Sequence, residues 1–405
     1  MAFALGVILF ALGIGLSIAL HEFGHLLIAK AFGMKVRRYF IGFGPRLFSF
    51  TRGETEYGFK AIPAGGFCDI AGMTALDELE PDEVDRAMYK QSAWKRIAVM
   101  LGGPISHFVI GIVLVYILGV GYGLPNLNPS TAATVGEVTC AAPSQDASGG
   151  YAGCTGPGPA QLAGMRPGDV ITAVNGTPTP TFGDVVTATQ ALQGAADFTV
   201  RRDGRDIQLR VQPAQVQRYV TEPNNPTPHE ATVAAIGVAP VQYLPVQYNA
   251  LSAIPGTVAF TGTMFDKTWQ GLLRFPEKIP AVVKAIGGAP RGADTPISVV
   301  GASVIGGQVA ERGLWQVFIL LLASLNFFIG VFNLVPLLPL DGGHMAITIY
   351  EKIRDTIRRT MGKAKGGPID YTKLLPLTYV VLLLGGGVTL LTVIADVVNP
   401  IQLFK

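Results

Sequence analysis

Charged side chains are scarce in this chain of 405 residues, and their scarcity limits the class of protein it can be. Asp, Glu, Lys and Arg make up 15% of the sequence, whereas 49% is hydrophobic. Typical soluble domains contain about 25% charged residues, and the mean hydropathy here is +0.40. The net charge of +3 is also too small to favour nucleic acid as a partner. The composition predicts a membrane protein that carries some soluble mass.

Charge is missing altogether from four long apolar stretches, residues 3–20, 97–120, 314–340 and 376–395. Each provides roughly the 20 residues that a helix needs to cross a hydrocarbon core about 30 Å thick. Lipid offers no partner to an unpaired backbone amide, so such stretches must cross as helices. The first lacks the basic start of a cleaved signal peptide and runs directly into His21, which favours a spanning helix there.

Lysine and arginine are absent before Lys30, and their distribution predicts the orientation. Eleven lie between Lys30 and Arg96, and seven between Lys352 and Lys373. Positive residues collect in short cytoplasmic loops. The twelve in residues 121–313 carry less weight, because so long a segment crosses regardless of charge. We expect the first and last connections in the cytoplasm, and both termini and the large middle segment outside it.

Cysteine is rare too, with three residues in the chain. Cys140 and Cys154 fall in the predicted external segment, and Cys68 falls in the cytoplasmic one. An oxidising compartment permits a disulfide between the outer pair. Two unpaired thiols are the alternative.

The first cytoplasmic connection shows two patterns. Residues 35–70 alternate aromatic and β-branched side chains with polar ones and contain turn-forming glycine and proline, which predicts strands. Residues 74–96 are acidic and then basic, and predict a surface helix that leads into the second span.

The external segment reads as a folded module followed by simpler pieces. From Gly156 onward the order is helix, turn, strand, turn, helix, strand and strand, which predicts a compact α+β module. Residues 213–230 are rich in proline and asparagine and predict a linker. Residues 250–290 alternate apolar and basic residues at roughly helical spacing, which predicts a helix on the outer membrane surface.

The sequence HEFGH at residues 21–25 is the first candidate site. Residues four apart share one face of a helix, so His21 and His25 can bind one metal ion. Glu22 projects beside them, where it can act as the general base of a metalloprotease. Ionisable residues inside a span are costly and are usually functional or paired. The alternative is that three polar residues merely cap the span.

A catalytic zinc keeps three protein ligands and one open position, so a third ligand is needed. Asp341 is the strongest candidate, because it ends the third apolar stretch in NLVPLLPLDGGH, after Pro336 and Pro339. Prolines free backbone groups in a span only where protein or a cavity receives them. A helix break beside an acid therefore indicates a site, with a loop cap as the alternative.

With these two motifs the chain resembles the site-2 protease family of intramembrane zinc metalloproteases. The likeness covers nearly the whole chain and includes four further motifs. They are PAGGF at Pro63–Phe67, GGP at Gly102–Pro104, TPISVVG before the third span, and an ending similar to DLVNP at Asp396–Pro400. A single PDZ-like module between spans two and three is similar to that of actinobacterial, including mycobacterial, members that cut anti-sigma factors.

The resemblance implies one Zn²⁺ per chain, held by His21, His25 and Asp341, with Glu22 as the general base. It also implies that Asn333 contacts substrate or stabilises the oxyanion. The alternative for this amide, eight residues before Asp341, is a packing hydrogen bond between helices.

Other positions have weaker indications. Gly65 and Gly66 would allow an unwound substrate strand to approach the β segment closely. His107 stands where family members usually have asparagine, and it could be a donor, a pH-sensitive neighbour of the zinc or a packing residue. His344 could orient a group beside the metal or belong to a loop. Asn326, one heptad before Asn333, is expected to pack.

The implied activity is hydrolysis of peptide bonds in or near transmembrane segments, close to the cytoplasmic face of a bacterial plasma membrane. The expected substrates are single-span membrane proteins such as anti-sigma factors. An upstream protease of the site-1 type would cut first, and the PDZ-like module would screen substrates by the size of their external remnant.

The predicted fold is a polytopic α-helical membrane protein with four transmembrane helices, a cytoplasmic membrane-associated β segment and an extracytoplasmic PDZ-like α+β domain. The boundaries are 1–33 for helix 1, 34–93 for the β segment and surface helix, 94–122 for helix 2, 123–240 for the PDZ-like domain with linker, 241–313 for a membrane-peripheral segment, 314–344 for a broken helix 3, 345–373 for a basic cytoplasmic loop and 374–398 for helix 4.

Two rival functions remain open from the sequence. A membrane-anchored HExxH protease with a solvent-exposed site would take its third ligand from a cytoplasmic domain, where no acid or histidine is placed as well as Asp341. An inactive scaffold would use only the PDZ-like domain and would not need the general base Glu22.

Overall fold

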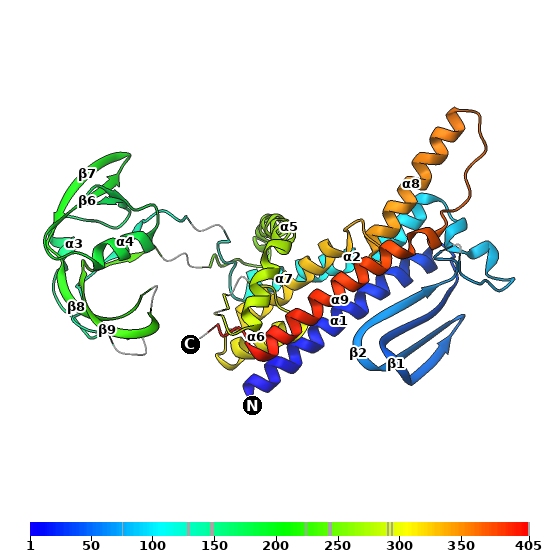
Figure 1. Cartoon of the computed structure of the whole chain (residues 1–405), viewed down its shortest axis with the longest axis horizontal. Coiled ribbons are helices and arrows are strands. Elements are labelled where there is room, and N and C mark those ends of the chain that lie inside the picture. The colour runs from blue at the N-terminus through cyan, green and yellow to red at the C-terminus, as the bar shows by residue number, and fades with distance from the viewer. Residues whose placement is uncertain are drawn as a thin grey trace. The chain divides into compact units, whose positions relative to one another are not determined.

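The computed structural model describes residues 1–74, 76–127, 130–145, 150–222, 225–241, 245–289, 291–292 and 295–403. It divides into two compact units. The first combines Met1–Leu124 with Val246–Lys405, and the second is Pro125–Pro245. The first unit is mainly helical and the second consists mostly of strands (Figure 1).

The four predicted apolar helices are confirmed. They are α1 (Ala2–Ala31), α2 (Ala93–Gly121), α7 (Trp315–Asn333) and α9 (Leu375–Val398). All four are long and apolar enough to cross a membrane. Helix α1 packs against α2, and α2 packs against α7, in an elongated bundle (Figure 1).

The third apolar helix ends earlier than the predicted limit of residue 344. It stops at Asn333, and Asp341 opens the next helix, α8 (Asp341–Thr360), instead of closing the third span. The predicted basic loop at residues 345–373 is therefore wrong over its first half. Ile349, Ile353 and Ile357 recur every four residues, which gives α8 an apolar stripe between its basic side chains.

The predicted surface helix at residues 74–96 is also wrong. Two single 3₁₀ turns, Val84–Arg86 and Met88–Lys90, occupy this region before α2 begins. Two acidic residues of this region form tertiary contacts, because Arg37 donates hydrogen bonds to Asp77 at 3.1 Å and to Glu83 at 2.9 Å. These hydrogen bonds lower the pKa of Glu83 to about 2, so the pair stays ionised at neutral pH.

The strands predicted in residues 35–70 are confirmed as β1 (Val36–Arg52) and β2 (Thr55–Ile70), which pair antiparallel. Both strands bend, so that the first part of β1 is paired on both sides. Phe40, for example, is opposite Gly58 and also opposite Phe67. Among the described residues, Gly66–Ile70 pairs only with β1, and this part of β2 forms an edge of the sheet.

The helix predicted within residues 250–290 is α5 (Ala253–Ile286), which continues through Pro276 and Pro280. It packs on α2, α7 and α9. A further helix that the sequence did not predict, α6 (Val299–Glu311), lies against α1. Gly306 permits this approach, because a Cβ there would lie 2.7 Å from the Phe10 ring.

The second unit has the element order expected for the α+β module. After β3 (Val135–Val138) come α3 (Pro159–Leu162), β4 (Val170–Val174), β5 (Thr177–Pro178), α4 (Phe182–Gln190), β6 (Ala196–Arg202), β7 (Arg205–Val211) and β10 (Val238–Pro240). The main sheet has the order β5-β4-β6-β7. Its core includes Ile171, Phe198 and Val200, which are fully buried.

The linker predicted at residues 213–230 is instead a hairpin of β8 (Ala214–Glu222) and β9 (Asn225–Ala235). Along β8, Val216 is buried between the exposed Gln215 and Gln217, a period of two that composition alone does not reveal.

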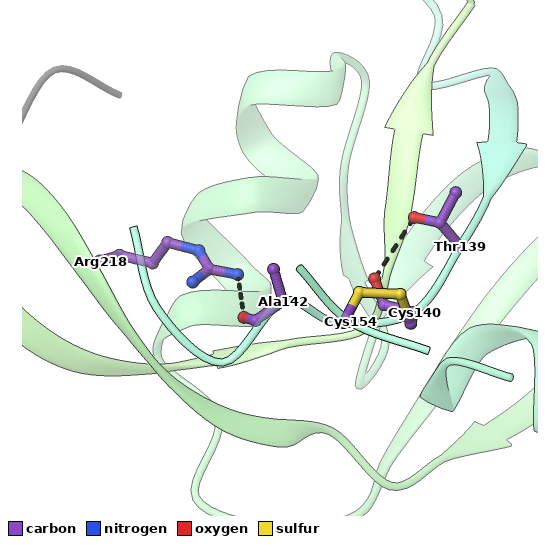
Figure 2. Close-up of a disulfide and its surroundings, with 5 residues drawn as sticks. All are labelled: Thr139, Cys140, Ala142, Cys154 and Arg218. Carbon is purple, nitrogen blue, oxygen red and sulfur yellow. Dashed lines mark hydrogen bonds between the residues drawn. A yellow bond between two sulfur atoms is a disulfide. The ribbon is translucent and has the colours of Figure 1, made fainter. Parts of the chain in front are cut away.

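Cys140 and Cys154 form a disulfide, with their Cα atoms 6.0 Å apart. Figure 2 shows the same loop tied at Ala142, whose carbonyl accepts a hydrogen bond from Arg218 at 2.8 Å. Of the two alternatives for the external cysteines, the structure has the bonded one.

A buried ion pair joins the end of α9 to the segment before α6. Arg291 and Asp396 lie 2.6 Å apart, each with 1% of its side chain exposed. Asp396 also accepts from the backbone N–H of Ser298 at 2.7 Å, and Arg291 donates to the carbonyl of Asn399 at 3.0 Å. The ion pair thus holds the end of α9 against the segment that leads into α6.

We expect Arg291→Ala to destabilise the protein by about 3–5 kcal/mol, because it leaves the Asp396 carboxylate buried without its cation. The measurement is the denaturant midpoint of the detergent-solubilised chain. Arg274→Ala, at an exposed position of α5, is the matched control and should change stability by at most about 0.5 kcal/mol. Equal midpoints for the two variants would contradict this role.

Candidate metal centre

His21 and His25 lie one turn apart near the end of α1, and both are buried. Their Nε2 atoms are 3.2 Å apart. Nδ1 of His25 lies 2.7 Å from the carbonyl oxygen of Val99 on α2. Because a carbonyl only accepts, Nδ1 must carry the proton, which leaves the Nε2 lone pair free for a metal ion.

Asp341 completes the cluster from the first turn of α8. Its Oδ2 is 3.3 Å from Nε2 of His21, and its Oδ1 is 3.4 Å from Nε2 of His25. One ligand atom from each residue lies within 4.8 Å of the other two. The structure therefore brings together the three residues that the sequence nominated as ligands.

The donor set can be tested against the metal that it would hold. Two imidazole nitrogens and one carboxylate oxygen, with room for a fourth ligand, are a set that zinc takes in catalytic sites. Oδ2 of Asp341 is buried and makes no hydrogen bond within the described part of the chain. A buried carboxylate oxygen of this kind is costly unless a cation or a donor faces it, so the residues fit a divalent ion.

Glycine lets α2 approach the two imidazoles. A Cβ on Gly103 would lie 2.6 Å from Nε2 of His21 and would overlap the His25 ring. At the same crossing, a Cβ on Gly24 would overlap the carbonyl of Gly102. The GGP motif is thus explained by close contact between α1 and α2 at the cluster.

The chain that precedes Asp341 folds back over its helix. A Cβ on Gly342 would collide with the carbonyl oxygens of Leu334 and Val335. A Cβ on Gly343 would lie 2.6 Å from the backbone of Leu337. The two glycines after Asp341 therefore allow the loop after α7 to cover the first turn of α8, which fixes the position of the carboxylate.

Glu22 lies beside the cluster, and its carboxylate interacts electrostatically with both imidazoles and with Asp341. The edge of β2 comes close on the other side, because a Cβ on Gly66 would be 3.2 Å from Cγ of Glu22. Gly65 has a φ of +128°, which disfavours any side chain there. Both glycines named from the sequence therefore lie near the candidate base.

Two further groups of the β segment lie near Glu22. Burial and the nearby Glu22 charge raise the pKa of the Cys68 thiol, and the same causes raise the pKa of Tyr39 to about 12. Both groups are therefore neutral at physiological pH.

His107 is buried, and its ring centroid is 5.0 Å from that of His21. Its Nδ1 pairs with Oδ1 of Asn326 at 2.9 Å, and Nδ2 of Asn326 donates to the carbonyl of Leu322 at 2.9 Å. The hydrogen bond to Asn326 is a packing contact, and a role of His107 as a neighbour of the zinc stays a prediction. The sequence indicated that Asn326 packs but gave no signal that His107 is its partner.

Within the described part of the chain, neither Asn333 nor His344 makes a hydrogen bond to His21, His25 or Asp341. Asn333 is the last residue of α7, and its side chain makes no hydrogen bond among the described residues. Nδ1 of His344 lies 3.4 Å from the Tyr371 hydroxyl, and the two rings stack with centroids 5.8 Å apart. Any substrate contact of Asn333 remains a prediction.

Comparison with known proteins relates the chain to a family of peptidases. Residues 9–374 match the model of Peptidase family M50. The chain is 50% identical over 405 residues to the zinc metalloprotease Rip1 of Mycobacterium bovis, covering 100% of both chains. It is 51% identical over 411 residues to Rip1 of Mycolicibacterium smegmatis, again covering 100% of both. A putative zinc metalloprotease of Mesorhizobium japonicum is 30% identical over 359 residues, covering 85% of this chain and 87% of its own.

We expect Gly103→Ala to weaken metal binding by roughly tenfold or more, because its methyl group would displace both imidazoles. Metal bound per chain after dialysis, measured by mass spectrometry, gives the result. Gly121→Ala in the same helix is the control, since a Cβ there meets nothing within 4 Å. Equal metal content in the two variants would show that Gly103 does not set the ligand geometry.

Proposed function

Since the chain belongs to peptidase family M50, as its resemblance to site-2 proteases predicted, we propose that it is a zinc endopeptidase that hydrolyses peptide bonds in or beside the transmembrane segments of other membrane proteins. The observation that carries this proposal is the meeting of His21, His25 and Asp341, with Glu22 beside them. An inactive scaffold would have no use for such a constellation.

In this proposal His21, His25 and Asp341 hold one Zn²⁺, and Glu22 moves the proton. The ion would supply Lewis-acid polarisation of the substrate carbonyl and acidify the attacking water. Glu22 accepts the proton from that water and returns it to the leaving amide nitrogen. The hydrogen bond from His25 to Val99 keeps the imidazole oriented throughout.

The substrate backbone has to be unwound, because a helix hides its carbonyls in its own hydrogen bonds. We propose that the unwound segment adds to the edge of β2 at Gly65 and Gly66. This edge is free of a second strand in the described part of the chain and lies beside Glu22. Strand addition there would present successive carbonyls to the metal centre. Asn333 is proposed to contact the substrate from the end of α7.

The proposed setting is a bacterial plasma membrane, with both termini outside and the active site near the cytoplasmic face. The positive residues between Lys30 and Arg96 support this orientation. The proposed substrates are single-span proteins such as anti-sigma factors, first cut outside by a protease of the site-1 type. The second unit is proposed to act as a PDZ-like filter that admits substrates with a short external remnant.

We expect Glu22→Gln to retain about one zinc per chain and to lose cleavage by a factor of about 10²–10⁴, the range for removal of a general base. The assay combines metal analysis with cleavage of a single-span reporter in proteoliposomes. His25→Ala should lose both metal and cleavage, whereas Glu311→Gln, at an exposed position of α6, should change neither. Undiminished cleavage by Glu22→Gln would contradict the proposed function.

The filter proposal can be tested by excision of the second unit. Leu124 and Val246, which flank it, are joined by two hydrogen bonds of 2.9 Å, so a short Gly-Ser linker can replace Pro125–Pro245 without separating the ends. We expect the excised enzyme to cleave an intact substrate and its externally truncated form at similar rates. The wild type should prefer the truncated form, and an unchanged preference after excision would refute the filter.

A further inference from the structure

A cleft of about 720 Å³ lies between α5 and the end of α7. Its volume is within the range of ligand-binding clefts, roughly 300–1,000 Å³. One wall consists of Gly262, Phe265, Trp269 and Leu273, and the spacing of the last three places them on one face of α5. Phe332 and Val335 belong to the opposite wall.

The first wall is linked to the metal centre through α2. The ring of Phe265 packs on Phe108 with centroids 5.8 Å apart. Phe108 follows His107, whose ring lies 5.0 Å from that of His21. The face of α5 that lines the cleft therefore packs on α2 beside the residue that contacts His21.

The second wall is linked to the metal centre through the loop after α7. The carbonyl of Val335, which lines the cleft, lies against Gly342, the neighbour of Asp341. The same segment thus covers the turn that carries the third ligand and forms one side of the cleft. The cleft is thus connected to the candidate metal centre directly through this loop and indirectly through α2.

The lining of the cleft suits apolar side chains. Phe265, Trp269 and Leu273 are each at least 42% exposed, so they present their apolar surface instead of burying it in the fold. The carboxylate of Asp266, which also lines the cleft, accepts a hydrogen bond from Gln270 at 2.8 Å. A transmembrane substrate is rich in the large apolar residues that such walls would bind.

We propose that this cleft is a specificity subsite, which receives a large apolar side chain of the substrate next to the scissile bond, and that Gly262 leaves the room for it. The inference rests on the proposed function and specifies which substrates are preferred. Binding of the side chain in the cleft holds the neighbouring carbonyl near Asp341 and Glu22, so it contributes to kcat/KM through positioning.

A larger side chain at position 262 would fill part of the cleft. A Cβ at this position meets nothing within 4 Å, so a larger residue there occupies open space without moving the backbone. Gly271 of the same helix has the same freedom and does not line the cleft. Gly262→Leu and Gly271→Leu are therefore matched in helix propensity and differ in whether they reduce the cleft.

The experiment uses the full-length enzyme in proteoliposomes with a single-span reporter whose cleaved bond is mapped by mass spectrometry. Each of the three residues on either side of that bond is replaced in turn by Ala and by Phe. We expect the wild type to prefer Phe at one position, and Gly262→Leu to reduce the Phe-over-Ala ratio of kcat/KM there by about tenfold or more. Gly271→Leu should keep the wild-type ratio.

Three outcomes would overturn the inference. The ratio could stay unchanged in Gly262→Leu, which is the expectation if a lipid chain fills the cleft. It could change equally in both variants, which would point to a general effect on α5. The wild type could also show no preference at any position. Failure of the proposed function looks different, because the wild type would then cleave no version of the reporter.

Discussion

The metal centre depends on the burial of two imidazoles and one carboxylate that come from helices far apart in the sequence. A polar group removed from water needs a compensating partner, and these three groups face one another with acceptor atoms that a shared cation would compensate. His21 and His25 fix one face of α1 toward Asp341, while Val99 fixes the His25 ring from α2. A shared cation would thus hold α1 and α8 together at the place where α2 packs against both helices.

Such a meeting is possible only where backbones approach closely, and glycine supplies the space. Gly24 and Gly102 bring α1 and α2 together, Gly103 leaves room for both imidazoles, and Gly342 receives the loop after α7. The glycines beside the HEFGH and LDGG motifs thus allow the close approach of the helices that carry the candidate ligands.

Much of the site could be predicted from the sequence because its signals are local. A spacing of four residues places His21 and His25 on one face of any helix, and the long apolar stretches define four helices without further information. Asp341 has no such local link to the histidines, and its choice depended on the proline break and on the resemblance to a family. Its position at the start of α8 required the fold.

The parts that the sequence did not predict are those decided by tertiary contacts. The acids of residues 74–96 favour a helix by composition, yet Asp77 and Glu83 pair with Arg37, and Val84–Arg86 and Met88–Lys90 form 3₁₀ turns in place of the helix. Helix α6 is short and rich in glycine, and its stability comes from contact with α1. The bond between His107 and Asn326 joins residues 219 positions apart, so no pattern along the chain could show it.

Hydrolysis inside a membrane sets two conflicting requirements, because the reaction needs a polar site with water and a cation, whereas the substrate needs an apolar site for its side chains. In this fold the polar surface and the apolar surface belong to different elements. The edge of β2 beside Glu22 offers backbone hydrogen bonds, which suit any sequence, and the cleft between α5 and α7 offers apolar contacts, which distinguish one sequence from another. On the proposed function, the strand edge would bind the main chain of the substrate and the cleft would read its side chains. Because the two surfaces belong to different elements, selectivity would be able to change through α5 without a change at Glu22, the proposed general base.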